Sequence, residues 1–258
     1  MSTRVQQLCS VRSCQEVAEN TFLLRFISQE IASSAEPGQF VNILASGNGA
    51  GVLLRRPFSI SRVEKDILEI LFHAIGPGTK LLSRKLPGNR IDVIGPLGQS
   101  FHGNAEFDTA FIVAGGIGVA PFPFLTDELL KRGKRIETFV GYRTAGQAFT
   151  SNLQHLHLAT DDGSGGFHGT VIQLLESSFV QDHSGKIKIF GCGPTVMLKA
   201  LGEFARRKQV CCELSLEGQM ACGFGICQGC AVERADDDGQ YALVCKDGPV
   251  FQSTEVNL

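Results

Sequence analysis

Residues 111–121 read Phe-Ile-Val-Ala-Gly-Gly-Ile-Gly-Val-Ala-Pro, an apolar run that ends in a glycine turn and a proline. The apolar run predicts a buried strand, and Pro121 suits the first turn of a following helix, where its missing N–H is not needed. Gly115, Gly116 and Gly118 would let a diphosphate approach the positive end of that helix. A single glycine turn is also typical of a plain strand–helix junction, so its meaning depends on the rest of the chain.

The chain around this turn alternates between strand-like and helix-length stretches. The predicted strands cover residues 110–114, 136–141 and 186–190, and the predicted helices cover residues 121–131, 170–179 and 195–208. This alternation predicts a parallel α/β sheet. Two more glycine-bearing loops follow predicted strands: Gly141-Tyr142-Arg143, and Gly191, Cys192, Gly193 and Pro194. Because the carboxyl ends of parallel strands share one edge of a sheet, the three loops are predicted to line one crevice for a nucleotide.

The first hundred residues have a different pattern, with short apolar or alternating runs between glycine and proline turns. These runs cover residues 21–27, 39–44, 57–61, 67–73 and 90–94. Short strands at this spacing predict an antiparallel barrel or sandwich.

Two segments of this region carry chemistry: Arg56-Pro57-Phe58-Ser59 and Gly76-Pro77-Gly78-Thr79. An arginine beside an aromatic ring and a hydroxyl can pair with a diphosphate and cover a bound ring. Alone, the first segment reads as a surface cation and the second as a turn. Together, and upstream of an α/β pattern, they indicate a binding site.

Four cysteines near the end of the chain, Cys222, Cys227, Cys230 and Cys245, have the spacing C-x4-C-x2-C…C. This is the spacing of plant-type [2Fe–2S] ferredoxins, in which three thiolates converge from one tight loop and the fourth arrives from a distant strand. The segment around them is too small to fold on a hydrophobic core alone, so a metal centre is expected to hold it together. A four-cysteine zinc site is the alternative, although structural zinc generally takes two C-x2–4-C pairs and Cys245 stands alone.

The composition excludes several other classes of protein. The 258 residues include 24 Lys and Arg against 26 Asp and Glu, a net charge of −2 that gives no support for nucleic-acid binding. The longest apolar runs contain glycines and are too short to span a membrane, and the N-terminus lacks the apolar region of a signal peptide, so we expect a cytoplasmic protein. The cysteines outside any motif are interpreted as small buried hydrophobes: Cys9, Cys14, Cys211 and Cys212.

These segments together resemble the ferredoxin–NADP reductase superfamily, and within it the electron-transfer subunits of class 1B dihydroorotate dehydrogenases. The likeness extends over essentially the whole chain and rests on residues 56–59, 78–79, 115–121, 160–164, 191–194, 215–217 and 244–251. It implies an FAD-binding β-barrel domain over residues 1–104, an NAD-binding α/β domain over residues 105–213 and a [2Fe–2S] domain over residues 214–258.

The resemblance also implies which residues bind each cofactor. FAD would contact Arg56, Pro57, Phe58 and Ser59, lie along Leu71, Phe72 and His73, and have its diphosphate held by Gly78 and Thr79. NAD would bind Gly115, Gly116, Gly118, Pro121, Arg143, Asp161, Gly191, Gly193 and Pro194, with Cys192 close to the nicotinamide. The loop after Arg143 lacks the acidic residues expected at the ribose of NAD, and Arg143 could face a 2′-phosphate, so NADP stays open.

As an enzyme, such a chain is an iron–sulfur flavoprotein oxidoreductase subunit. The resemblance implies an FMN-containing partner subunit that oxidises dihydroorotate in pyrimidine biosynthesis, in a heterotetramer with two copies of each chain. FAD would exchange hydride with NAD and single electrons with the cluster. Two alternatives remain: the reductase subunit of another complex (a hydrogenase, a sulfide or sulfite enzyme, or an NADPH–ferredoxin oxidoreductase), and a zinc-stapled nucleotide-binding regulatory module without redox turnover.

The cysteine interpretation predicts the effect of Cys227→Ser. This variant is expected to lose acid-labile sulfide and electron transfer to a partner, because one iron loses a ligand. NADH oxidation by an artificial acceptor that takes electrons from the flavin is expected to persist. Loss of FAD with the sulfide retained would contradict the assignment of the cysteines.

Overall fold

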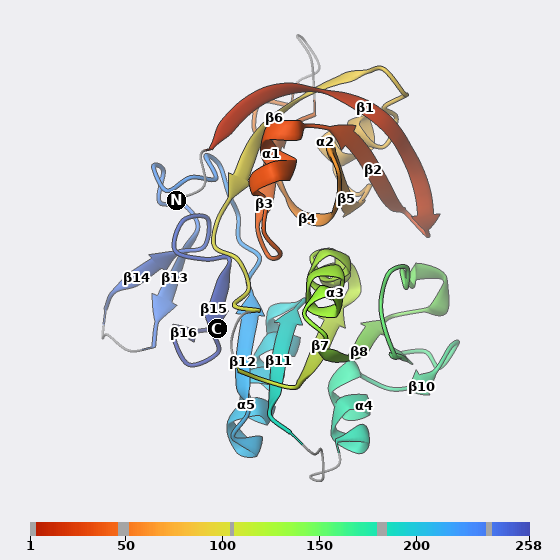
Figure 1. The fold of residues 1–258 in the computed structure, drawn as a ribbon, viewed down its shortest axis with the longest axis vertical. Coiled ribbons are helices and arrows are strands. Elements are labelled where there is room, and N and C mark those ends of the chain that lie inside the picture. Colours follow the sequence, from red (N-terminus) through yellow and green to blue (C-terminus); the bar gives the residue numbers. More distant parts are fainter. Residues whose placement is uncertain (1–3, 46–51, 104–105, 180–184, 236–238) are drawn as a thin grey trace.

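The computed structural model describes residues 4–45, 52–103, 106–179, 185–235 and 239–258. It contains a closed barrel, a seven-stranded sheet with helices on both faces, and a small three-stranded sheet near the C-terminus (Figure 1). The fold class predicted from the sequence is therefore confirmed. Within the described ranges, no helix combines the length and the apolar character needed to cross a membrane.

Six antiparallel strands form the barrel in the order β1-β2-β5-β4-β3-β6. They are β1 (Val5–Ala18), β2 (Thr21–Ile27), β3 (Phe40–Leu44), β4 (Arg56–Glu64), β5 (Ile67–His73) and β6 (Arg90–Leu97), with the short helices α1 (Gln29–Ser34) and α2 (Pro77–Leu82). Leu24, Phe26, Ile60 and Ile70 fill the interior without exposure to solvent. The sequence does not predict β1, because the polar residues of this strand give no continuous apolar run.

The central sheet has six parallel strands in the order β10-β9-β8-β7-β11-β12. They are β10 (Phe167–His168), β9 (Leu156–Thr160), β8 (Arg135–Tyr142), β7 (Thr109–Gly115), β11 (Ile187–Cys192) and β12 (Cys211–Ser215). The helix α3 (Phe122–Lys131) packs in one buried cluster with β7 and β8, whereas α4 (Val171–Ser178) and α5 (Thr195–Lys208) pack in another. Every residue of β7 is buried, as expected for a central strand covered on both faces.

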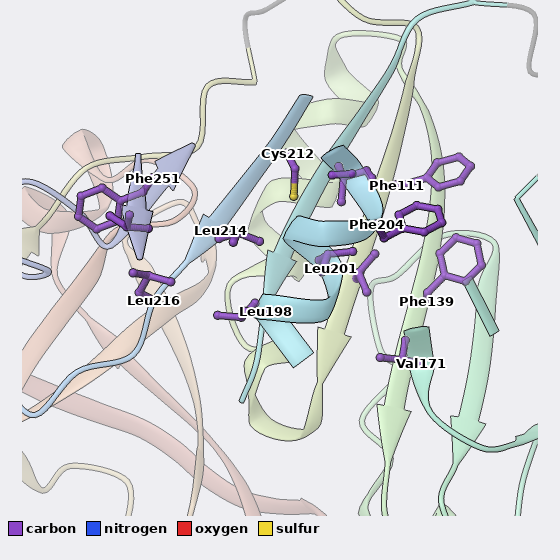
Figure 2. Packing of buried hydrophobic residues seen from close by; sticks show 14 of the residues in the cluster. Phe111, Phe139, Val171, Leu198, Leu201, Phe204, Cys212, Leu214, Leu216 and Phe251 are labelled. Carbon is purple, nitrogen blue, oxygen red and sulfur yellow. The ribbon is translucent and has the colours of Figure 1, made fainter. Parts of the chain in front are cut away.

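The C-terminal segment is joined to this sheet by a strand that the sequence did not predict. While β13 (Ala231–Arg234), β14 (Tyr241–Leu243) and β16 (Val256–Asn257) form the small sheet, β15 (Val250–Gln252) pairs antiparallel with β12. Leu216 and Phe251 belong to the same buried cluster as Leu198, Leu201 and Leu214 (Figure 2). The segment therefore shares a hydrophobic core with the central sheet.

The proposed division into three domains has to accommodate this sharing. Its boundary after residue 213 falls within β12, and its boundary between residues 104 and 105 lies outside the described residues. We keep the three parts as a proposal for the binding regions. Strand β15 of the C-terminal part joins the sheet of the nucleotide-binding part.

A buried ion pair connects the parts at the edge of the sheet. The carboxylate of Glu213, which is not exposed to solvent, accepts hydrogen bonds from Lys188 Nζ at 2.8 Å and Gln252 Nε2 at 3.0 Å. Its second oxygen accepts the backbone N–H of His102 at 2.9 Å, and Lys188 Nζ donates to the carbonyl of His102 at 3.0 Å. Strands β11, β12 and β15 and the segment after the barrel thus meet at one carboxylate.

Lys188→Met is expected to lower the free energy of unfolding by roughly 3–5 kcal/mol, because it removes the buried cation of the Glu213 carboxylate and leaves the exposed His102 ring, with Nδ1 at 2.7 Å, as the one ionisable partner in the described contacts. Lys186→Met is the matched control, since Lys186 pairs with Glu106 at 3.3 Å between two largely exposed side chains. Exposed pairs of this kind contribute little. Equal losses in the two variants, measured by thermal and urea unfolding, would contradict this role of the buried pair.

Candidate functional site

A cavity of about 270 Å³ lies where the barrel, the central sheet and the C-terminal segment meet. The barrel residues in its lining include seven of those predicted for FAD: Pro57, Phe58, Ser59, Leu71, Phe72, His73 and Thr79. Cys192 lines it from the end of β11, and Leu216 and Glu217 line it from the chain that follows β12. Its mostly apolar wall suits a flat aromatic ring system.

Arg56 and Gly78, the remaining two residues predicted for FAD, do not line this cavity but lie together beside it. A Cβ atom built on Gly78 would be 3.8 Å from Arg56 Cγ and 3.9 Å from Arg56 Nε. Arg56 Nη1 donates to the carbonyls of Leu54 and Arg55, at 2.9 and 3.1 Å. The neighbouring Arg55 is held in an ion pair with Asp92 at 2.6 Å. Arg56 is thus the one of these two arginines that has no carboxylate partner among the described contacts.

A larger crevice of about 1140 Å³ lies along the carboxyl edge of the parallel strands. Strand register explains it, since Gly115 pairs with Gly141 and Ala114 pairs with Cys192, so their strands end at one level. Six of the residues predicted for NAD line the crevice: Gly115, Gly116, Arg143, Asp161, Gly193 and Pro194. His73, Ile75, Ile117 and Glu217 line both this crevice and the smaller cavity, so the two spaces adjoin.

Three other residues predicted to bind NAD lie next to the crevice, where neighbouring elements pack closely against one another. A Cβ on Gly118 would lie 2.4 Å from the carbonyl oxygen of Cys192, and one on Gly191 would lie 2.5 Å from Leu201. Pro121 is the cap of α3. These positions let the η1 turn (Gly116–Val119) and α5 approach β11, which shapes the crevice from behind.

Glu217 is a site residue that the sequence did not predict, although residues 215–217 carry part of the family resemblance. Glu217 lines the small cavity, the nucleotide crevice and a third hollow beside the cysteine loop. Its side chain reaches solvent, but desolvation among these recesses raises the pKa of the carboxyl. Glu19 and Asn20, in the turn between β1 and β2, also line the crevice. No local motif marks them, because the barrel brings them there over more than a hundred residues of sequence.

The four cysteines are grouped in two pairs. The N–H of Cys227 points at Cys222 Sγ at 3.4 Å, and the N–H of Cys245 points at Cys230 Sγ at 3.4 Å. The N–H of Gly225 links the pairs, since it donates to Cys245 Sγ at 3.1 Å. Gly225 has a φ of +90°, a left-handed conformation that glycine adopts without strain. Amide donors aimed at sulfur atoms are typical of iron–sulfur sites.

The environments of these thiols shift their pKa values in opposite directions. Desolvation alone raises the pKa of Cys222, but backbone N–H groups, that of Cys227 first, lower it more, to about 6. Burial, followed by the neighbouring Cys230, raises the pKa of Cys245 to about 12. Four thiolates here therefore need the positive charge of metal ions. Across the described ranges, no three His, Cys, Asp or Glu side chains are grouped around one point.

Comparison with known proteins agrees with this arrangement. Residues 217–257 match the family model described as the iron-sulfur cluster binding domain of dihydroorotate dehydrogenase B. The chain is 38% identical over 257 residues to the dihydroorotate dehydrogenase B (NAD(+)) electron transfer subunit of Geobacillus thermodenitrificans, covering 96% of this chain and 97% of the relative. It is 38% identical over 250 residues to the subunit of the same name from Desulforamulus reducens, covering 93% and 94% of the two chains.

Two solved structures show the same fold. The NADH-dependent reduced ferredoxin–NADP oxidoreductase superposes with a TM-score of 0.84 at 28% identity, covering 97% of this chain and 90% of that chain. The Amycolatopsis cytochrome P450 reductase superposes with a TM-score of 0.66 at 18% identity, covering 81% and 68% of the two chains. The second similarity is one of fold alone.

Arg56→Ala is expected to weaken FAD retention, because the guanidinium beside Gly78 is placed to pair with a diphosphate. The measurement is flavin absorbance per chain after gel filtration. Arg90→Ala is the control, since Arg90 is exposed and donates to the carbonyl of Leu8. Wild-type flavin content in Arg56→Ala would exclude this role.

The thiol of Cys192 is expected to resist alkylation in the folded protein. Burial, followed by the charge of Glu217, raises the pKa of this thiol, so its reactive thiolate is scarce at pH 8 and increases only at much higher pH. Of the cysteines expected from the sequence to be buried, Cys9 and Cys212 are buried, Cys14 is half-buried and Cys211 is exposed. Iodoacetamide at pH 8 should therefore label Cys211 and spare Cys192, as read by peptide mass spectrometry. Equal labelling of the two would show that the cavity wall opens readily.

Proposed function

The chain belongs to the family of dihydroorotate dehydrogenase B electron transfer subunits, and we propose that it passes electrons from a dihydroorotate-oxidising partner to NAD+ in pyrimidine biosynthesis. It is an oxidoreductase subunit that uses FAD, a [2Fe–2S] cluster and NAD. The proposal rests above all on the cavity at the junction of the three parts. Its lining joins predicted flavin residues of β4 and β5 to Cys192 of the nucleotide region and to residues 215–218, which lead into the cysteine loop.

Each group of residues has a stated task in this proposal. Arg56, Gly78 and Thr79 bind the FAD diphosphate, while Phe58, Leu71 and Phe72 keep water from the ring. Gly115, Gly116, Gly193 and Pro194 let NAD lie against the strand ends, where backbone N–H groups receive its diphosphate. Cys222, Cys227, Cys230 and Cys245 hold the cluster. When bound, FAD supplies the exchange between hydride and single electrons.

The electron balance assigns substrate chemistry to the partner. Conversion of dihydroorotate to orotate releases two electrons and two protons, and NAD+ takes up both electrons with one proton. Removing a C–H proton needs a positioned general base. The described lining of the flavin cavity offers only His73 and Glu217 as titratable groups besides Cys192, and both adjoin the nucleotide crevice. We therefore assign this step to an FMN-containing catalytic subunit, in a heterotetramer with two copies of each chain.

The exposed side of the cysteine loop is the proposed docking surface for that partner. Cys227 is exposed, and Ile226 beside it is 75% exposed, whereas Cys230 and Cys245 are buried. An exposed apolar residue next to a cluster ligand suits a docking surface across which electrons pass. A cytoplasmic location is also part of the proposal, because free thiolates that hold a cluster require a reducing compartment.

The full-length similarity to the NADH-dependent reduced ferredoxin–NADP oxidoreductase supports a second candidate. In that case the partner would be another reductase or ferredoxin-linked chain, and NADP could take the place of NAD. The two candidates use the same binding regions of this chain, so they differ in the nucleotide, the partner and the partner's substrate.

Co-expression of this chain with the products of its neighbouring genes distinguishes the two candidates. We expect a co-purifying FMN subunit and dihydroorotate-dependent reduction of NAD+ that this subunit alone does not support. The complex that carries Cys227→Ser should retain FMN in its partner subunit but should not reduce NAD+ when dihydroorotate is supplied. A complex that contains all cofactors but does not oxidise dihydroorotate would favour the second candidate. A chain without flavin or broad visible iron–sulfur absorbance would contradict both.

A further inference from the structure

A buried asparagine of the barrel holds the cysteine loop. Asn42 lies in β3 and is 0% exposed. Its Nδ2 donates to the carbonyl oxygen of Cys222 at 2.9 Å, across 180 positions of sequence. The proposed function assigns no role to Asn42, and no local motif marks this residue. The contact joins a strand of the barrel directly to the first ligand of the predicted cluster.

The other half of the same amide is unsatisfied. Asn42 Oδ1 is buried and has no hydrogen-bond partner among the described residues. A buried oxygen without a partner is unfavourable, and an apolar side chain of similar size would avoid this cost. Packing alone therefore does not account for an asparagine here. The donor on Nδ2 is the feature that an apolar residue could not supply.

The cysteine loop is shaped to receive this donor. Gly223, the residue after Cys222, has a φ of +82°, and a Cβ there would lie 2.6 Å from Asn42 Nδ2. The same Cβ would lie 3.6 Å from Leu97 Cδ1, at the end of β6. Any residue other than glycine would combine backbone strain with a clash against the amide. Asn42 and Gly223 thus fit each other closely.

Strand register brings Asn42 next to the flavin cavity. Asn42 pairs with Pro57 across β3 and β4, so the two side chains project from the same face of the barrel. Pro57 lines the cavity proposed for FAD. Of these two paired residues, Pro57 therefore contacts the proposed flavin site and Asn42 contacts the cysteine loop.

A second and weaker contact lies on the other side of the site. Gln99, just after β6, donates from Nε2 to the carbonyl of Lys246 at 3.0 Å, and Lys246 follows Cys245. This side chain is exposed, so water can replace its hydrogen bond. The backbone N–H of Gln99 also donates to the carbonyl of Gly248 at 2.7 Å and does not depend on the side chain. Gln99 therefore offers a matched comparison for Asn42.

We propose that Asn42 is a positioning residue that fixes the spacing between the flavin cavity and the cysteine loop. The inference rests on the proposed function, because spacing matters only if electrons pass between these two sites. Without the Nδ2 donor, the loop has no buried polar anchor on the barrel at Cys222, and it can shift relative to Pro57 while its own thiols still converge.

The test compares Asn42→Leu with Gln99→Leu in the purified holoprotein. Asn42→Leu should keep wild-type FAD content and wild-type NADH oxidation by an artificial flavin-level acceptor. Its cluster should be reduced by NADH several-fold more slowly in stopped-flow absorbance, because the rate of electron tunnelling falls as the separation between two cofactors grows. The electron paramagnetic resonance spectrum of the reduced cluster should shift as well. Gln99→Leu should match the wild type in all four measurements.

Asn42→Ser covers the case in which Asn42→Leu loses its cluster. The serine hydroxyl keeps a donor on a smaller side chain, so an intermediate rate and an intermediate spectrum are expected. Wild-type rates and spectra in the asparagine variants, or equal changes in Gln99→Leu, would overturn the proposal. A wild-type protein without FAD or cluster would instead refute the proposed function, so the two failures are distinguishable.

Discussion

The buried packing between the central sheet and the C-terminal segment holds the binding regions in one arrangement. Leu198, Leu214, Leu216 and Phe251 belong to a single cluster (Figure 2). The same cluster includes Cys230 and Cys245. Residues 214–258 are too few to form a stable core alone, so they complete the core of the neighbouring sheet. Moving them away would expose this apolar surface, at about 25 cal/mol per Å².

This packing also determines where the two open spaces lie. Because β15 fixes the C-terminal segment against β12, the chain after Ser215 passes between the barrel and the nucleotide crevice. Glu217 consequently lines the cavity and the crevice together. Desolvation raises the pKa values of both Glu217 and Cys192, which reflects the limited solvation of the wall between the spaces. A poorly solvated wall of this kind strengthens the hydrogen bonds that fixed donors make to a bound ring.

Polar contacts add orientation to this apolar frame. The carboxylate of Glu213 joins three strands and the segment after the barrel, and Asn42 joins the barrel to the loop of Cys222. Buried groups of this kind contribute little net stability compared with apolar replacements, but they are costly to break singly. Their value lies in selecting one relative placement of the parts, which a relay of electrons between fixed cofactors requires.

The sequence alone determined the features that depend on short spacings. The cysteine spacing, the glycine turn at residues 115–118 and the alternation of strands and helices each reflect local chemistry, and the parallel sheet and the C-terminal cysteine segment follow from them. The short strands of the first hundred residues left an antiparallel barrel and a sandwich open. Only the tertiary structure decided the contacts that join distant residues: β15 on β12, Glu217 between the cavities, Glu19 at the crevice and Asn42 on Cys222. Such contacts leave no periodic or spacing signal, because each depends on the packing of whole elements rather than on neighbours along the chain.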